Sequence, residues 1–277
     1  MEQGVVPDTL DKISKNGDVI FEVGEEATPR RRILVSSAIL SNASTAFAAL
    51  LGPHFREGQL LASASTNGPV TIPLPEDEPQ AMSDLLRLLH LINVPELAWA
   101  DDFPRIFAFA LAADKWCCVD ALHLQSQGIL LNSLNVLERL PGLSDEPFDE
   151  GKAVIELANA AYLLNQHPSF CLLVMRLLLR QTGSYLQLSK KVDGDVLPLK
   201  FYFVLEERRT LARHKISSGL TDLATWCLNC HEWITSKIVP EFQKHLLQDV
   251  KDMWQPVWQE PWFSLETGLQ HDLQGMS

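Results

Sequence analysis

The residues with the clearest chemical potential are Cys227, Cys230 and His231, in the run Cys-Leu-Asn-Cys-His. This run has the pattern of covalent c-type haem attachment, and a Cys-x-x-Cys pair also suits zinc or a redox couple. Haem attachment requires export, for which we see no signal, and His214 and His245 lie at separations unlike a compact zinc finger. On a helix the two cysteines share a face with aliphatic residues, which favours burial as small hydrophobic residues. Structural metal and redox chemistry stay as alternatives.

Other patterns that carry catalysis are missing from the sequence. It contains no Gly-x-Ser-x-Gly elbow, no Gly-rich phosphate loop and no His-Glu-x-x-His. The carboxylates of Glu76, Asp77 and Glu78 offer an acid/base or cation site, but they precede Pro79, where a helix is expected to start. Acidic residues at that place are favoured by the helix dipole. We therefore expect no enzymatic activity, no bound metal and no cofactor.

The charge and hydropathy of the sequence limit the kinds of partner that we expect for this protein. The 277 residues include 23 Lys/Arg and 35 Asp/Glu, and the acidic excess lies in residues 1–150, with 10 basic against 22 acidic residues. Nucleic-acid binding needs basic side chains that neutralise phosphates, so nucleic acid is not an expected partner. No apolar run approaches the roughly 20 residues that cross a bilayer, so no membrane is expected. Five cysteines without a secretory signal predict an intracellular protein, in cytoplasm or nucleus.

The periodicity of apolar residues predicts a mixed first half and a helical second half. Strands are expected at 17–23, 32–35 and 70–74, the first two as a hairpin and the third at an edge because of Pro73. Residues before Gly17 have a weak helical pattern, and 58–69 reads as a loop. Helices are expected at 36–51, 79–92, 103–115, 119–131, 152–165, 169–181, 199–215 and 220–238.

These pieces carry a family resemblance. Residues 17–23 look like a first strand, and the pair Ile39-Leu40 with Ser44 and Phe47 fits a helix signature that the family shares. Further matching segments are Ser36-Ser37, Phe55-Arg56-Glu57, the run from Leu74 to Pro79 with Ala81, Leu85-Leu86 and His90, and Ala112-Ala113-Asp114-Lys115-Trp116. Together they resemble the BTB/POZ domain in its fungal form, over about residues 17–130.

The resemblance implies a protein-interaction module without an active site. Asp18 falls in the family's dimer-facing region, and Phe55 and Glu57 fall where some members bind a cullin-type ubiquitin-ligase scaffold. An exposed aromatic side chain beside a carboxylate offers apolar burial and a charge that fixes register. Alternatively, Phe55 packs against the preceding helix, Glu57 is solvated and Asp18 only marks a turn. The short segment before Gly17 argues against a strand-exchanged homodimer.

The sequence therefore predicts an α+β protein. A BTB/POZ-like domain at 17–130, with a small sheet and helices, is followed by a linker at 131–151 and a mainly α-helical region at 152–277. The expected function is protein–protein interaction as a scaffold or adaptor, with itself or another protein as partner. The alternatives are a substrate receptor for a cullin-type ubiquitin ligase and a metal-stabilised or redox protein that uses Cys227 and Cys230.

Overall fold

The computed structural model describes residues 10–25, 30–63, 68–92, 99–139, 149–192 and 194–226, with side chains as far as Ser218. The chain forms two compact units, which we consider one at a time. The first holds the chain up to Leu173 together with Gln187–Leu197, and the second holds Val174–Leu186 together with the chain from Pro198 on. The predicted domain at 17–130 and the predicted linker at 131–151 stay predictions.

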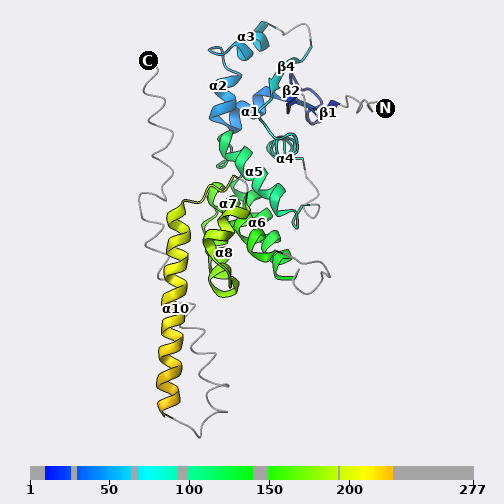
Figure 1. Ribbon diagram of the computed structural model, residues 1–277. Coiled ribbons are helices and arrows are strands. Elements are labelled where there is room, and N and C mark those ends of the chain that lie inside the picture. Colours follow the sequence, from blue (N-terminus) through cyan, green and yellow to red (C-terminus); the bar gives the residue numbers. More distant parts are fainter. Residues whose placement is uncertain are drawn as a thin grey trace, which may run out of the picture. The chain divides into compact units, whose positions relative to one another are not determined.

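A four-stranded sheet opens the first unit (Figure 1). Its strands are β1 (Leu10–Lys12), β2 (Val19–Val23), β3 (Arg31–Val35) and β4 (Val70–Leu74), in the order β1-β3-β2-β4. The predicted hairpin is confirmed, because β2 and β3 pair antiparallel. β4 pairs parallel with β2 and lies at the edge, where Pro73 removes no hydrogen bond from a further strand. The central strand β2 is buried on both faces, so its side chains form the middle of the core.

β1 corrects the weak helical pattern predicted before Gly17. This short strand pairs parallel with β3, and the backbone N–H groups of Ile13 and Ser14 both donate to the carbonyl of Leu34. Ile13 is buried behind it. A segment as short as β1 does not form a stable helix by itself, because isolated short helices are marginal in water. Pairing with β3 therefore determines its conformation.

The region between β3 and β4 differs from prediction in two places. A single helix was expected at 36–51, but α1 (Ser37–Ala43) and α2 (Thr45–Leu50) are separated by Ser44, whose backbone is extended. The Ser44 hydroxyl accepts the N–H of Phe47 and so caps α2. Residues predicted as a loop from 58 onward instead belong largely to α3 (Arg56–Ser63).

The remaining helices of the first unit begin where the sequence places capping residues. Glu78 accepts backbone N–H groups at the start of α4 (Pro79–Leu89), as Asp102 does for α5 (Phe103–Lys115) and Asp149 for α7 (Glu150–Leu163). The bounds of α5 are those predicted. Helix α6 (His123–Arg139) continues across residue 130, the predicted domain end.

The later helices are α8 (His167–Arg180), α9 (Tyr185–Leu188), a 3₁₀ turn (Ser189–Lys191) and α10 (Leu199–Trp226). The predicted break between 215 and 220 is wrong, since α10 is continuous there. In the second unit, the buried Arg209 holds α10 against the end of α8 by donating to the carbonyls of Gln181 and Gly183 and pairing with Glu206. None of the described helices combines the length and apolar character needed to cross a membrane.

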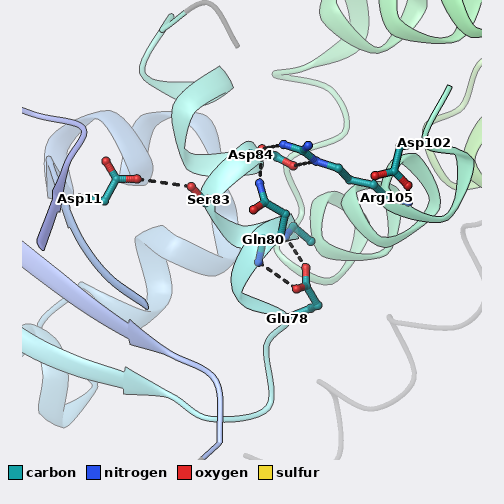
Figure 2. Close-up of polar contacts among 8 residues, drawn as sticks. Asp11, Glu78, Gln80, Ser83, Asp84, Asp102 and Arg105 are labelled. Atoms are coloured by element: carbon teal, nitrogen blue, oxygen red, sulfur yellow. Dashed lines mark hydrogen bonds and ion pairs between the residues drawn. The ribbon is translucent and has the colours of Figure 1, made fainter. Parts of the chain in front are cut away.

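Helix α4 ties the sheet to the helices through two ion pairs. The Asp84 carboxylate, 2% exposed, accepts from Nε of Arg105 at 2.7 Å and from Nη2 at 2.8 Å, and it also accepts from Gln80 (Figure 2). One turn further along α4, Arg87 donates to both carboxylate oxygens of Asp11 in β1. A single helix thus connects β1 on one side and α5 on the other.

We predict that Arg105→Ala lowers the free energy of unfolding by about 3–5 kcal/mol, because it leaves the buried Asp84 carboxylate without its partner. Urea denaturation of the purified chain measures this. The matched control is Lys191→Ala, which breaks a pair with Asp149 whose side chains are about half exposed and which should cost less than about 1 kcal/mol. Equal losses in the two variants would contradict a dominant buried pair.

Candidate protein-binding surface

Helix α3 can approach the end of α2 closely because Gly58 has no side chain. A Cβ atom built at Gly58 would lie 1.8 Å from the carbonyl oxygen of Gly52, so the two backbones approach more closely than any other residue would permit. Gly58 is buried, and α3 also contacts β4. The helix is therefore fixed in place by its inner face, which leaves its outer face available.

Two large apolar side chains are exposed at α3, one just before the helix and one on it. Phe55, just before the helix, is 51% exposed, and Leu60 is 45% exposed. Phe55 therefore leaves about half of its side-chain surface open to a partner. Leu60 was missed by the sequence analysis, because residues 58–69 are mostly small and polar and read as a loop. Its only sequence signal is the leucine pair at 60–61.

Glu57 lies in the first turn of α3, where a carboxylate is favoured by the helix dipole, and precedes Leu60 by three residues. It is half-buried, and among the residues that the structure describes it has no hydrogen-bond or ion-pair partner. Glu57 and Phe55 lie two residues apart at one end of α3, as the sequence requires. The arrangement offers an incoming protein apolar area to bury and a carboxylate to pair.

Asp18 has a contact within the chain. Its carboxylate accepts both the backbone N–H and the hydroxyl of Ser37, at the start of α1. The cap residue Ser36 makes no side-chain capping bond of its own, so Asp18 from the sheet supplies that function. The structure does not bring Asp18 into contact with Phe55 or Glu57, and a role for it in partner binding stays a prediction.

His90 supports the same helix start. Its Nε2 accepts the backbone N–H of Ser36 at 3.0 Å, which places the ring proton on Nδ1, where it is donated to the carbonyl of Leu86 at 2.8 Å. The ring is therefore neutral. Burial is the main cause that lowers the pKa of His90 below its usual 6.5.

Some of the residues on which the resemblance rests form one cluster in the structure. The rings of Phe47 and Trp116 stack at 4.4 Å with an angle of 4° between them, and the Ser44 hydroxyl donates to the Trp116 carbonyl. Asp77 accepts the Trp116 indole N–H at 3.1 Å and pairs with Lys115 at 2.9 Å. Three segments far apart in the sequence thus form one cluster, in which the Asp77 carboxylate both accepts a hydrogen bond and forms an ion pair.

The residues for which cysteine chemistry was predicted, Cys227, Cys230 and His231, lie beyond the described residues. Among those that are described, no three His, Cys, Asp or Glu side chains gather as a metal site. Cys117 is exposed and has a positive φ of 50°, so it is not a packing residue. Cys118 is buried, and burial raises the pKa of its thiol to about 12.

No family model matches the sequence, and no curated protein is significantly similar to it. What the chain does has therefore to be inferred from its own residues and their geometry.

We predict that Gly58→Ala destabilises the protein by about 1–3 kcal/mol or more, since the added methyl group would overlap the Gly52 carbonyl. The control is Gly128→Ala in α6, where an added Cβ meets nothing within 4 Å. There the better helix propensity of alanine should stabilise by about 0.5–1 kcal/mol. Thermal and urea unfolding of both variants measure the difference, and the same sign of effect in both would contradict the close approach.

We also predict a pH dependence from His90. Because its folded-state pKa is lowered, the unfolded chain takes up the proton first as pH falls. Its contribution to stability is complete above about pH 6.5 and is lost as the pH falls from there toward the folded-state pKa. His90→Gln removes this loss, whereas substitution of the exposed His54 by Gln does not. Unfolding free energies measured across this range test it, and parallel profiles for wild type and His90→Gln would refute it.

Proposed function

We propose that the chain is a protein-binding scaffold or adaptor and that its contact surface is the outer face of α3. Phe55 and Leu60 would supply the apolar contact, and Glu57 would pair with a basic or hydrogen-bond donor group of the partner. The observation that carries the proposal is the exposure of Phe55, just before α3, and of Leu60, on the helix that the Gly52–Gly58 approach holds in place.

The exposed apolar side chains of this surface would gain free energy if a partner protein buried them. Complete burial of a Phe or Leu side chain by a partner is worth roughly 1.5–3 kcal/mol each. A helix fixed by its inner face loses little conformational freedom on binding, and such preorganisation preserves more of that gain as affinity. The unpaired carboxylate of Glu57 at the border of the apolar area adds specificity.

The chain's other ionisable groups support the same function class. Asp84, Asp77 and Asp18 all have partners within the chain, at a helix–helix contact, in an aromatic cluster and at a helix cap. These contacts explain the carboxylates structurally without a reaction. The α+β architecture with a small sheet agrees with the coarse class expected for a BTB/POZ-like domain.

A narrower form of the proposal names the partner as a cullin-type ubiquitin-ligase scaffold, so that the chain acts as a substrate receptor. Two things support this form: the resemblance of Phe55-Arg56-Glu57 to the family's aromatic-x-Glu segment, and the exposure of Phe55 at the start of a short helix. A second copy of the chain is the other candidate partner.

We predict that the double variant Phe55→Ala/Leu60→Ala loses partner proteins that the wild type retains in quantitative pull-downs. A central aromatic contact is typically worth about 2 kcal/mol, or roughly thirty-fold in Kd. The matched control is Leu131→Ala, because Leu131 on α6 is as exposed as Leu60. Partners that persist in the double variant, or that also disappear with Leu131→Ala, would contradict a role for α3.

The narrower form is tested separately with purified cullin. Wild-type binding that Phe55→Ala and Glu57→Lys both abolish supports the substrate receptor, and failure of the wild type to bind removes it. Light scattering of the purified chain tests the second copy as partner, which predicts a dimer that Phe55→Ala/Leu60→Ala dissociates.

A further inference from the structure

Residues 210–218 of α10, the last whose side chains the structure describes, include no buried side chain. The first part of this 28-residue helix (Figure 1) is different, because Phe201, Tyr202, Leu205 and Arg209 are all buried. A helix in a protein is stabilised mainly by the face that it buries, since helix propensity alone is marginal in water. Among the described residues, nothing buries a side of α10 beyond Arg209, which indicates that this part of the helix is covered by something else.

The side of α10 opposite its buried residues carries two large apolar side chains. Phe203 is 53% exposed and Leu211 is 42% exposed. The exposed Glu207 lies between them, one turn from each, and the exposed His214 follows Leu211 by three residues. Spacings of four, four and three residues place all four side chains on one side of a helix. We name these four residues the α10 face, and all of them belong to the second compact unit.

The polar groups of the α10 face differ in kind along the helix. Glu207 and His214 lie two turns apart, and neither has an ion pair or a side-chain hydrogen bond among the residues that the structure describes. The neighbouring Glu206 is used within the unit, where it pairs with Arg209 and accepts the backbone N–H of Tyr185. The α10 face thus offers an incoming surface a carboxylate at one position and an imidazole two turns further on.

A second copy of α10 matches this pattern when the two helices run antiparallel. A two-fold axis between residues 210 and 211 sets Glu207 of each copy opposite His214 of the other. An imidazole can donate a hydrogen bond to a carboxylate whether or not it carries a charge. A parallel copy would set carboxylate against carboxylate, and a uniformly acidic or uniformly basic helix would match only one of the two groups. The occupant that satisfies both groups is therefore the chain itself.

We propose that the chain self-associates through the α10 face as an antiparallel pair of helices. Leu211 packs against its copy beside the two-fold axis, Phe203 is covered near each end of the contact, and Glu207 of each copy binds His214 of the other. The contact covers the part of α10 that the described residues leave exposed. This surface belongs to the second unit alone, so the inference does not depend on the function proposed for α3.

Light scattering and sedimentation of the full chain, at concentrations up to roughly 200 μM, measure the association. A contact made by one pair of helices is small, so we expect an equilibrium between monomer and dimer that shifts with concentration. Phe203→Ala/Leu211→Ala should raise the Kd of the dimer by roughly tenfold or more, because it removes the apolar contacts. The matched control is Leu124→Ala, at a 75% exposed leucine on α6, which should leave the Kd unchanged.

Exchange of the two polar groups is the decisive test. Glu207→Lys sets a cation opposite His214, and His214→Glu sets two carboxylates opposite each other, so each variant should raise the Kd by roughly tenfold. The double variant Glu207→Lys/His214→Glu restores opposite charges between antiparallel helices and should return the Kd to within roughly threefold of the wild type. An equimolar mixture of the two single variants should likewise associate more tightly than either variant alone. Circular dichroism confirms that each variant is folded before its Kd is used.

Three results would overturn the proposal. A wild type that stays monomeric at the highest concentration would remove it. A double variant that associates as weakly as the two single variants would contradict the antiparallel pairing. A dimer that Phe55→Ala/Leu60→Ala dissociates, while the α10 variants have no effect on it, would assign self-association to α3 instead.

Discussion

The buried contact between Asp84 and Arg105 is the interaction on which the described N-terminal unit depends. A carboxylate withdrawn almost completely from water costs several kcal/mol unless it is paired and hydrogen-bonded. Here the Arg105 guanidinium provides two bonds, Gln80 provides a third, and the hydrogen bond with Asp84 raises the pKa of Arg105. Because the pair joins α4 to α5, the charge is stable only when these helices meet in this register.

Helix α4 also connects this ion pair to the sheet. Arg87 follows Asp84 by three residues and binds Asp11 of β1, so α4 is tied at neighbouring turns to a strand and to a helix. The core between them is apolar, with Leu85 and Leu86 fully buried. Paired charges at its border specify orientation, and the apolar contacts supply the main favourable free energy.

Local signals in the sequence determined much of the fold. The hairpin of β2 and β3, the edge position of Pro73 and the caps Glu78 and Asp102 follow from alternation, from the missing proline N–H and from carboxylates before helix starts. The Phe-x-Glu segment likewise marked one end of the candidate surface. These features depend on residues within a few positions of each other, so a single sequence contains them.

Only the tertiary structure decided the rest, because each remaining feature depends on a neighbour distant in the chain. β1 is a strand because β3 lies beside it, and α3 forms over a predicted loop where Gly58 meets the backbone at Gly52. The exposure of Phe55 likewise depends on which parts of the folded chain leave its side chain uncovered. Hydropathy marks such residues as candidates for burial, and it cannot say whether the chain itself or another protein buries them.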